Sequence, residues 1–189
     1  METPIETPIE KAEYKEFTIN IFPDDSPMNP REYDNLGHMI CWHKRYDLGD
    51  KHIWSSPQLF QEWANEQDGK LFLLSLYLYD HSGITMRTSP FDCPWDSGRV
   101  GYIYATREEA FKEFGVHRVT KAFREKIRKI LGAEVVSYDK YLTGAFVGFQ
   151  IRDKDGECID SCWGFDDVEY AILEAKGMVD CYVQKSVAV

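Results

Sequence analysis

Residues 71–79 (LFLLSLYLY) form a nearly unbroken apolar stretch, and this feature most restricts what the chain can fold into. The stretch is far shorter than the roughly 18 apolar residues that suggest a membrane-spanning helix. Its length and composition are typical of a β-strand that is covered on both faces. We therefore expect a central strand here, with residues 100–105 (VGYIYA) as its neighbour, and no contact with a membrane.

Further strand patterns lie near both ends of the chain. Residues 16–22 alternate apolar and polar side chains, which predicts a half-buried strand. Residues 145–152 and 157–163 flank the sequence Asp-Lys-Asp-Gly at 153–156, and Asp-Gly favours the tight turn of a hairpin. Residues 38–46 fit either a strand or a short helix.

Helical patterns occupy much of the remainder. They are recognised by capping residues, by apolar residues at intervals of three and four, and by glycines that end them. We expect helices from Ser56 to the residue before Gly69, over 107–114, over 119–131 and from Asp166 to the C-terminus. Residues 135–142 either continue the helix over 119–131 or form a second helix.

These elements do not alternate as a regular βαβ series, so the pattern predicts an α+β fold. We expect one mixed central sheet of about five strands, including an antiparallel hairpin, packed by three to five helices. The length of 189 residues suits a single domain. Residues 1–15 are acidic and interrupted by Pro4 and Pro8, which predicts a flexible tail followed by a domain over 16–189.

The five cysteines are an odd set without a closely spaced pair, which indicates neither a disulfide framework nor a zinc ribbon. A reducing cytoplasm fits this pattern best. The P-loop and dinucleotide glycine patterns, the zincin helix and the Gly-x-Ser-x-Gly elbow are all absent from the sequence, which argues against the commonest enzyme classes. No cofactor is expected.

The formal net charge of −10 is unevenly distributed along the chain. Residues 1–35 hold nine acids and three bases, and residues 134–189 hold eleven acids and five bases, whereas residues 101–133 hold eight bases and four acids. Acidic ends argue against general affinity for DNA or anionic lipid. They favour a basic partner, although a charge of this size also serves solubility alone.

The loop between the two expected central strands is the strongest candidate for a catalytic site. It holds Asp80 and His81, followed by Asp92, Cys93 and Asp96. Cys93 is a candidate nucleophile, with His81 as its base and Asp80 or Asp96 as the orienting acid. Alternatively, Asp80, His81, Asp92 and Asp96 form an oxygen-rich set that suits a divalent metal. A third interpretation is structural, in which these polar groups satisfy each other and the backbone.

A second polar cluster lies in residues 34–52. Its members are Asp34, His38, His43, Asp47, Asp50 and His52. Five residues separate His38 from His43, which places them on opposite faces of a strand and far apart on a helix. We therefore interpret these residues mainly as surface polar groups, with a metal site as the alternative.

The expected helix over 119–131 is also basic. Its flanking and surface positions include Arg118, Lys121, Arg124 and Arg128, while its apolar stripe predicts packing against a core. A solvated helix face is one interpretation, and local contact with a nucleic acid is the other.

Three stretches resemble small proteins carried by bacteriophages, plasmids and mobile elements. They are residues 29–37 (NPREYDNLG) with Cys41-Trp-His43, residues 77–101, and residues 160–164 (DSCWG). Such accessory sets include anti-CRISPR and antirestriction proteins. The resemblance implies this setting and identifies no catalytic residues.

This setting leads to our main functional hypothesis. The chain is expected to be a non-enzymatic acidic binding protein that inhibits a host nucleic-acid-targeting defence complex, with Asp166, Asp167 and Glu169 on its acidic face. Its partner is then a basic nucleic-acid-binding protein complex. The alternative is a small hydrolase or nuclease, either metal-dependent or not, that uses the Asp80/His81 and Asp92/Asp96 loop.

Overall fold

The computed structural model describes residues 7–187, and the chain folds as two compact units. The central unit comprises residues 29–143, and the terminal unit combines residues 1–28 with residues 144–189. The α+β class is confirmed. The strands do not join in one mixed sheet: in the described residues they form two separate four-stranded sheets, each entirely antiparallel.

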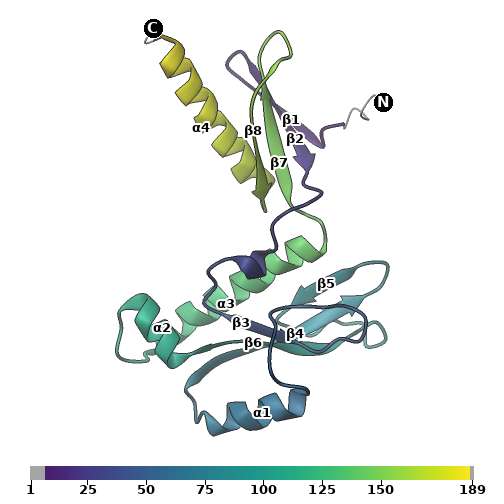
Figure 1. Ribbon diagram of the computed structural model, residues 1–189, viewed down its shortest axis with the longest axis vertical. Helices are drawn as coiled ribbons and strands as arrows, with labels where there is room; N and C mark the ends of the chain where they lie inside the picture. Colours follow the sequence, from purple (N-terminus) through teal and green to yellow (C-terminus); the bar gives the residue numbers. More distant parts are fainter. Residues whose placement is uncertain (1–6, 188–189) are drawn as a thin grey trace. The chain divides into compact units, whose positions relative to one another are not determined.

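The terminal unit is an antiparallel sheet with one helix on it (Figure 1). The sheet has the strand order β1-β2-β7-β8, so strands from the two ends of the sequence pair in its middle. Its elements are β1 (Glu10–Tyr14), β2 (Phe17–Pro23), β7 (Val147–Arg152), β8 (Cys158–Phe165) and α4 (Val168–Val187).

Small side chains on α4 allow the helix to pack closely against this sheet. Ala171, Ala175 and Val179 are fully buried. They lie in one hydrophobic core with the β2 and β7 side chains Ile21 and Phe149, which are also fully buried. The helix therefore covers the apolar face of the sheet.

Strand β1 occupies part of the segment expected to be a tail. It pairs with β2 along its whole length, from Glu10 opposite Ile21 to Tyr14 opposite Phe17. The apolar side chains Ala12 and Tyr14 pack on the core, which explains why this acidic stretch is ordered. Residues 1–6 of the expected tail lie outside the described residues.

The hairpin between β7 and β8 forms at the predicted turn. Gly156 has a φ of +84°, a backbone conformation that favours glycine. The carboxylate of Asp153 accepts hydrogen bonds from the backbone N–H groups of Asp155 and Glu157 at 3.0 and 2.9 Å. In this turn, Asp153 thus accepts the backbone hydrogen bonds and Gly156 adopts the positive φ.

The central unit has a sheet with the order β3-β6-β4-β5. The expected strand over 71–79 is β4, and its predicted neighbour is β6. The elements of the unit are the short 3-10 helix η1 (Pro30–Glu32), β3 (His38–Cys41), α1 (Pro57–Glu66), β4 (Leu71–Asp80), β5 (Ile84–Arg87), β6 (Ser97–Thr106), α2 (Arg107–Phe114) and α3 (Lys121–Leu142).

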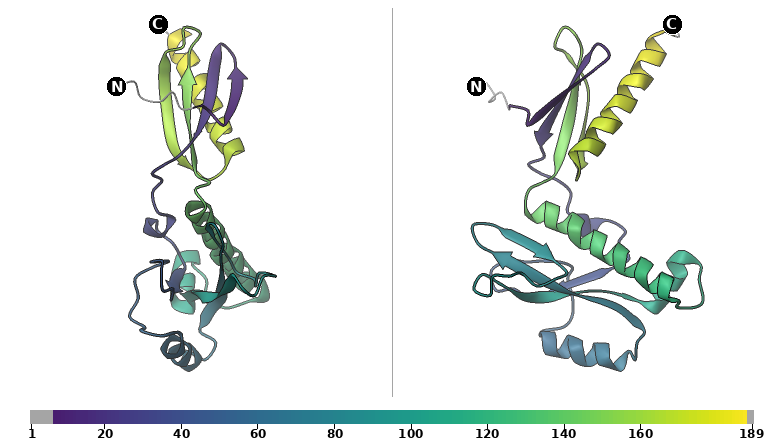
Figure 2. Two further views of the ribbon diagram at one scale, coloured as in Figure 1. Left: turned by 90° about the vertical axis from the view of Figure 1, so that its right-hand side faces the viewer. Right: turned by 180° about the vertical axis from the view of Figure 1, so that it is seen from behind.

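Helices α3 and α1 lie on opposite faces of this sheet, and β6 is buried on both sides (Figure 2). Towards α3, the core contains Leu76, Ile103 and Ile127, all fully buried. Towards α1, Phe60 packs among aromatic rings that include Tyr102 at a centroid distance of 5.1 Å. Strand β4 departs from the expected burial on both faces: Phe72, Leu76 and Leu78 are buried towards α3, whereas Leu73 on the other face is 37% exposed.

Two segments of the central unit, residues 132–142 and the segment after β4, differ from or settle what the sequence predicts. Helix α3 continues through Gly132 to Leu142, because Leu131, Val135 and Tyr138 remain buried on the same side. The segment after β4 is not a simple loop, since β5 turns back to pair with β4. No helix in the described part of the chain is long and apolar enough to cross a membrane.

Candidate functional site

Two of the three motif stretches meet at a hollow on the central unit. Trp42 and His43, which follow β3, lie on one side, and the segment from Trp95 to Val100 lies on the other. The hollow has a volume of about 360 Å³ and is also lined by Arg45 and Asp80. The indole of Trp95 is 92% exposed, so this rim presents a large aromatic surface to solvent.

Asp80 is held by an ion pair at this hollow. Arg45 Nη2 donates a hydrogen bond to Asp80 Oδ2, and the Tyr46 hydroxyl donates to Asp80 Oδ1 at 3.3 Å. The hydrogen bond that Arg45 donates to Asp80 raises the pKa of Arg45 above its ordinary value. The carboxylate of Asp80 is thus occupied by Arg45 and Tyr46, which lie outside the loop of residues 80–98.

His81, Cys93 and Asp96 come together, but Asp96 lies between the other two. His81 Nδ1 is 3.4 Å from Asp96 Oδ2, and Cys93 Sγ is 3.7 Å from the same oxygen. A reactive cysteine is usually stabilised as a thiolate by a histidine or a positive charge. Here the contact of Cys93 is a carboxylate, so the order of groups does not match a Cys-His-Asp triad.

The histidines of residues 34–52 face different surroundings. His43 Nδ1 accepts the backbone N–H groups of Arg45 and Tyr46, and the His43 ring stacks on Tyr46 at 5.0 Å. His52 Nε2 lies 3.0 Å from the carbonyl oxygen of Cys41. In the part of the chain that the structure describes, no group of three or more His, Cys, Asp or Glu side chains is placed to hold a metal ion.

His38 pairs with a helix cap rather than with another histidine. Its Nε2 is 2.8 Å from Glu109 Oε1, and the other carboxylate oxygen of Glu109 accepts the Thr106 hydroxyl at 2.6 Å. Partial burial opposes the charge of Glu109, but hydrogen bonds from Thr106 and His38 outweigh it and lower the pKa of Glu109. This arrangement caps α2 and gives His38 a structural role.

Sequence reasoning missed the main polar network of the central unit. The side chain of Arg31, only 5% exposed, donates two hydrogen bonds of 2.8 Å to Asp50 and one of 3.0 Å to Glu134. Glu134 also accepts the backbone N–H groups of Leu36 and Gly37. The motif at residues 29–37 therefore fastens η1 to α3, and its role is structural.

Burial of Arg31 opposes its positive charge. Hydrogen bonds to Asp50 and Glu134 outweigh this cost and raise the pKa of Arg31 above its ordinary value. No spacing rule could have found the network, because the three residues are far apart in sequence and nothing marks them as partners. Only the folded structure brings Arg31 into contact with Asp50 and Glu134.

The acidic residues expected on the binding face lie where α4 begins. Asp167 caps the helix, because its Oδ1 accepts the backbone N–H of Tyr170 at 2.8 Å. Glu169 and Asp167 are exposed, whereas Asp166 is half-buried. The sheet adds two further acids, since Asp24 Oδ2 accepts the backbone N–H of Gly164 at 3.0 Å and Asp25 follows it in the chain.

The charge of the chain is divided sharply between the two units. Residues 1–28 and 144–189 hold 16 acids and six bases, a net charge of −10. Residues 29–143 hold 16 acids and 16 bases, so the central unit is formally neutral. The whole net charge of the chain thus belongs to the smaller unit.

Comparison of this chain with protein-family models, with curated proteins and with solved structures found no match. The sequence and the geometry described above are therefore the basis for the functional argument.

Proposed function

We propose that the chain is a non-enzymatic binding protein whose acidic terminal unit occupies a basic nucleic-acid-binding surface on a partner protein complex. The partner class that fits the resemblance is a host nucleic-acid-targeting defence complex, which the chain would inhibit. The observation that carries the proposal is the net charge of −10 on one unit beside a neutral one.

Concentrating charge in one unit has a physical consequence for binding. An acidic surface attracts a basic channel over a distance comparable to the Debye length, about 8 Å at physiological salt, and competes there with phosphate groups. The central unit has no net charge that would oppose this attraction. A charge spread evenly over the whole chain would give a weaker field at any one face.

Not all acids of the terminal unit are suitable for testing the proposal. Asp167 caps α4 and Asp24 bonds the backbone of β8, so their substitution would disturb the fold. Asp25 and Glu169 are exposed and make no such contacts in the described part of the chain. Charge reversal at these two residues changes the acidic face with little effect on folding.

The experiment is capture of partners from a host lysate with three baits. The wild-type chain is compared with Asp25→Lys/Glu169→Lys and with Glu62→Lys/Glu66→Lys, which makes the same change in net charge on α1 of the neutral unit. We expect basic nucleic-acid-binding proteins to be captured by the wild type and the α1 variant, and lost with the terminal variant. Added DNA should compete with capture.

Equal loss with both variants would contradict the proposal, because it would show that only total charge matters. Equal retention by all three baits would contradict it as well, since the acidic face would then be dispensable.

A further inference from the structure

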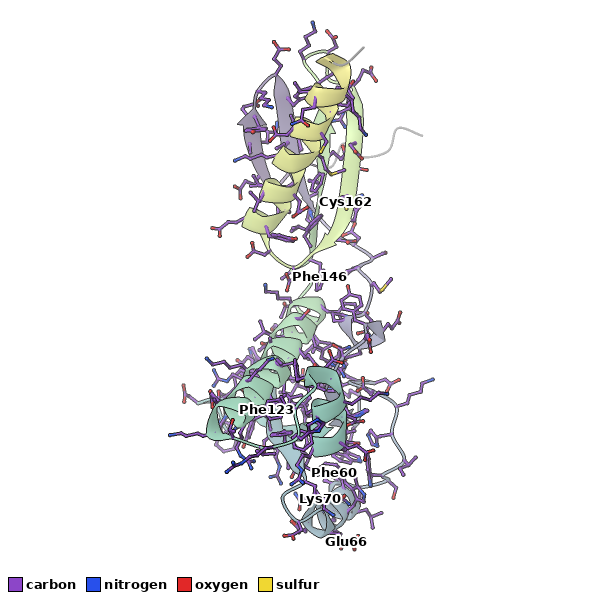
Figure 3. All side chains as sticks on the ribbon, turned by 90° about the vertical axis from the view of Figure 1, so that its left-hand side faces the viewer. Phe60, Glu66, Lys70, Phe123, Phe146 and Cys162 are labelled. Atoms are coloured by element: carbon purple, nitrogen blue, oxygen red, sulfur yellow. The ribbon has the colours of Figure 1, made fainter. Side chains whose placement is uncertain are left out.

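An aromatic cluster supports one end of the central unit. Phe123, in the first turn of α3, is labelled in Figure 3. Its ring lies 5.9 Å from that of Phe72 on β4 and 6.0 Å from those of Phe111 and Phe114 on α2. The four rings therefore join three secondary-structure elements at a single centre.

Each of the three outer rings of this cluster carries a cation. The guanidinium of Arg124 lies 5.7 Å from the centre of Phe72, and that of Arg107 lies 5.3 Å from the centre of Phe111. The ammonium of Lys126 lies 3.7 Å from the centre of Phe114. A cation over an aromatic face is attracted to it and loses part of its side-chain freedom while its charge stays accessible.

Further bases extend the positive surface along α3. Lys121, Arg124 and Arg128 are spaced three and four residues apart, so they form one stripe about 10 Å long. Lys129 and Arg118 are also exposed. We call the eight bases of residues 107–129 the basic patch: Arg107, Lys112, Arg118, Lys121, Arg124, Lys126, Arg128 and Lys129.

The basic patch is not neutralised by its neighbours. Four glutamates, Glu108, Glu109, Glu113 and Glu125, lie within the same residues, but in the described part of the chain none of the eight bases is ion-paired with a carboxylate. This contrasts with Arg31 and Arg45 of the same unit, which do have carboxylate partners. A group of unpaired, exposed cations is therefore concentrated in a unit whose net charge is zero.

We propose that the basic patch binds the sugar-phosphate backbone of a nucleic acid. Phosphates follow one another in a line that a stripe of bases on a helix can track, and arginine forks donate two hydrogen bonds to one phosphate. Contacts of this kind carry no sequence preference. The patch belongs to the central unit, so this inference is independent of the partner proposed for the terminal unit.

The test is fluorescence anisotropy of the purified full-length chain with labelled nucleic acids of about 20 base pairs or nucleotides. A DNA duplex, single-stranded DNA and single-stranded RNA are titrated separately over a range of salt concentrations. We expect binding that weakens with salt, with a slope of log K against log salt of about −3 to −5 for the duplex. The form bound most tightly identifies the preferred nucleic acid.

Two matched double variants locate the interaction. Lys121→Gln/Arg128→Gln removes two bases of the stripe, and glutamine retains the helix propensity of the residues it replaces. Lys44→Gln/Lys51→Gln removes two exposed bases of the same unit outside the patch. The first pair should lower affinity about tenfold or more and make the salt slope shallower by about 2, whereas the second should change neither. Far-ultraviolet circular dichroism checks that both variants fold.

Three results would overturn the inference. One is the absence of salt-dependent binding to all three nucleic acids at low salt. Another is an equal loss of affinity in both double variants. The third is self-association of the wild-type chain in sedimentation that the stripe variant abolishes while nucleic-acid binding persists, because the patch would then bind the acidic unit of a second copy.

Discussion

The two units of this chain achieve order by different means. The terminal unit rests on backbone pairing between adjacent strands and on small apolar residues of one helix, and it carries the entire net charge. The central unit balances its charges, buries an Arg31 network and surrounds its sheet with aromatic rings. The difference shows that the net charge of the whole chain describes only the terminal unit, because the central unit is formally neutral.

The comparison also predicts where each unit is vulnerable. Polar contacts between residues far apart in sequence are concentrated around Arg31 in the central unit, so loss of one charge there leaves others buried. In the terminal unit, the ring of Trp163 lies directly over the backbone of Gly148, which leaves no room for a larger residue there. Substitutions can therefore be chosen that affect one unit and spare the other.

The largest effect is expected from Arg31→Ala. Removing this guanidinium leaves Asp50 and Glu134 without their cationic partner, which should lower the free energy of unfolding of the central unit by about 3 kcal/mol or more. Urea denaturation followed by tryptophan fluorescence measures this directly, because four of the five tryptophans lie in residues 29–143.

Arg45→Ala is the matched control for this prediction. It also removes an arginine paired with a carboxylate, but the Arg45 side chain is 66% exposed and Asp80 keeps its hydrogen bond from the Tyr46 hydroxyl. Its denaturation midpoint should remain close to that of the wild type. If both variants lowered the free energy of unfolding by similar amounts, the buried Arg31 network would stabilise the unit no more than the exposed Arg45–Asp80 ion pair does.

Local patterns explain which parts of the fold were predictable. The Asp-Gly turn, the helix that follows the Ser56 cap and the helix over 107–114 are each encoded within a few neighbouring residues, and the structure confirms them. The division into two sheets depends on pairing between β2 and β7, which lie far apart in sequence. An alternating apolar pattern predicts a strand but does not indicate which other strand it pairs with. The sequence was therefore equally compatible with a single sheet and with two sheets.

The candidate site was predictable only in part for the same reason. The sequence indicated that Asp80, His81, Cys93 and Asp96 share one region. In the structure, Asp80 and Asp96 line the hollow with Trp42 and His43, and His81 and Cys93 contact Asp96. The ion pair of Asp80 with Arg45 and the position of Asp96 between Cys93 and His81 required side-chain geometry. Neither follows from spacing along the chain.

Two glycines of the terminal unit should respond in opposite directions. A Cβ at Gly148 would lie 2.1 Å from a ring atom of Trp163, so Gly148→Ala should destabilise this unit by about 1–3 kcal/mol. Gly177, within α4, has open space around it, and Gly177→Ala should stabilise the unit by up to about 1 kcal/mol. Native-state amide hydrogen exchange in β7 measures both effects. Two shifts of the same sign would contradict the packing described for this sheet.

High pH should weaken the central unit through Cys41. Burial, followed by the negative charge of Asp50, raises the pKa of the Cys41 thiol from 9.0 to about 12. The stabilisation is therefore complete below pH 9, where the unfolded chain also keeps this proton, and is lost as the pH rises towards 12. Near pH 10 the expected slope is about 1.4 kcal/mol per pH unit for this group.

Denaturation at a series of pH values, with Cys41→Ala as the comparison, measures this slope. The variant should show a shallower decline between pH 9 and pH 10. Above pH 10, Tyr104 contributes in the same direction, because burial raises its pKa from 10.0 to about 12. Parallel curves for the wild type and Cys41→Ala would contradict the assignment to Cys41.

The smallest effects are expected in the loop that sequence analysis favoured for catalysis. His81→Ala and Cys93→Ser should each change stability by less than about 0.5 kcal/mol and leave partner capture intact. Thermal melting and the capture experiment test this together. If His81→Ala or Asp96→Ala abolished function at an unchanged melting temperature, the hydrolase alternative would replace the binding proposal.

The most direct test of the central claim is the affinity for a captured partner at low and high salt. The wild type, Asp25→Lys/Glu169→Lys and Glu62→Lys/Glu66→Lys are compared by isothermal titration calorimetry. Our account predicts that the terminal variant binds much more weakly than the other two at low salt, and that this difference shrinks as salt rises. Identical affinities for the two variants, or a difference that salt does not change, would contradict the assignment of binding to the acidic terminal unit.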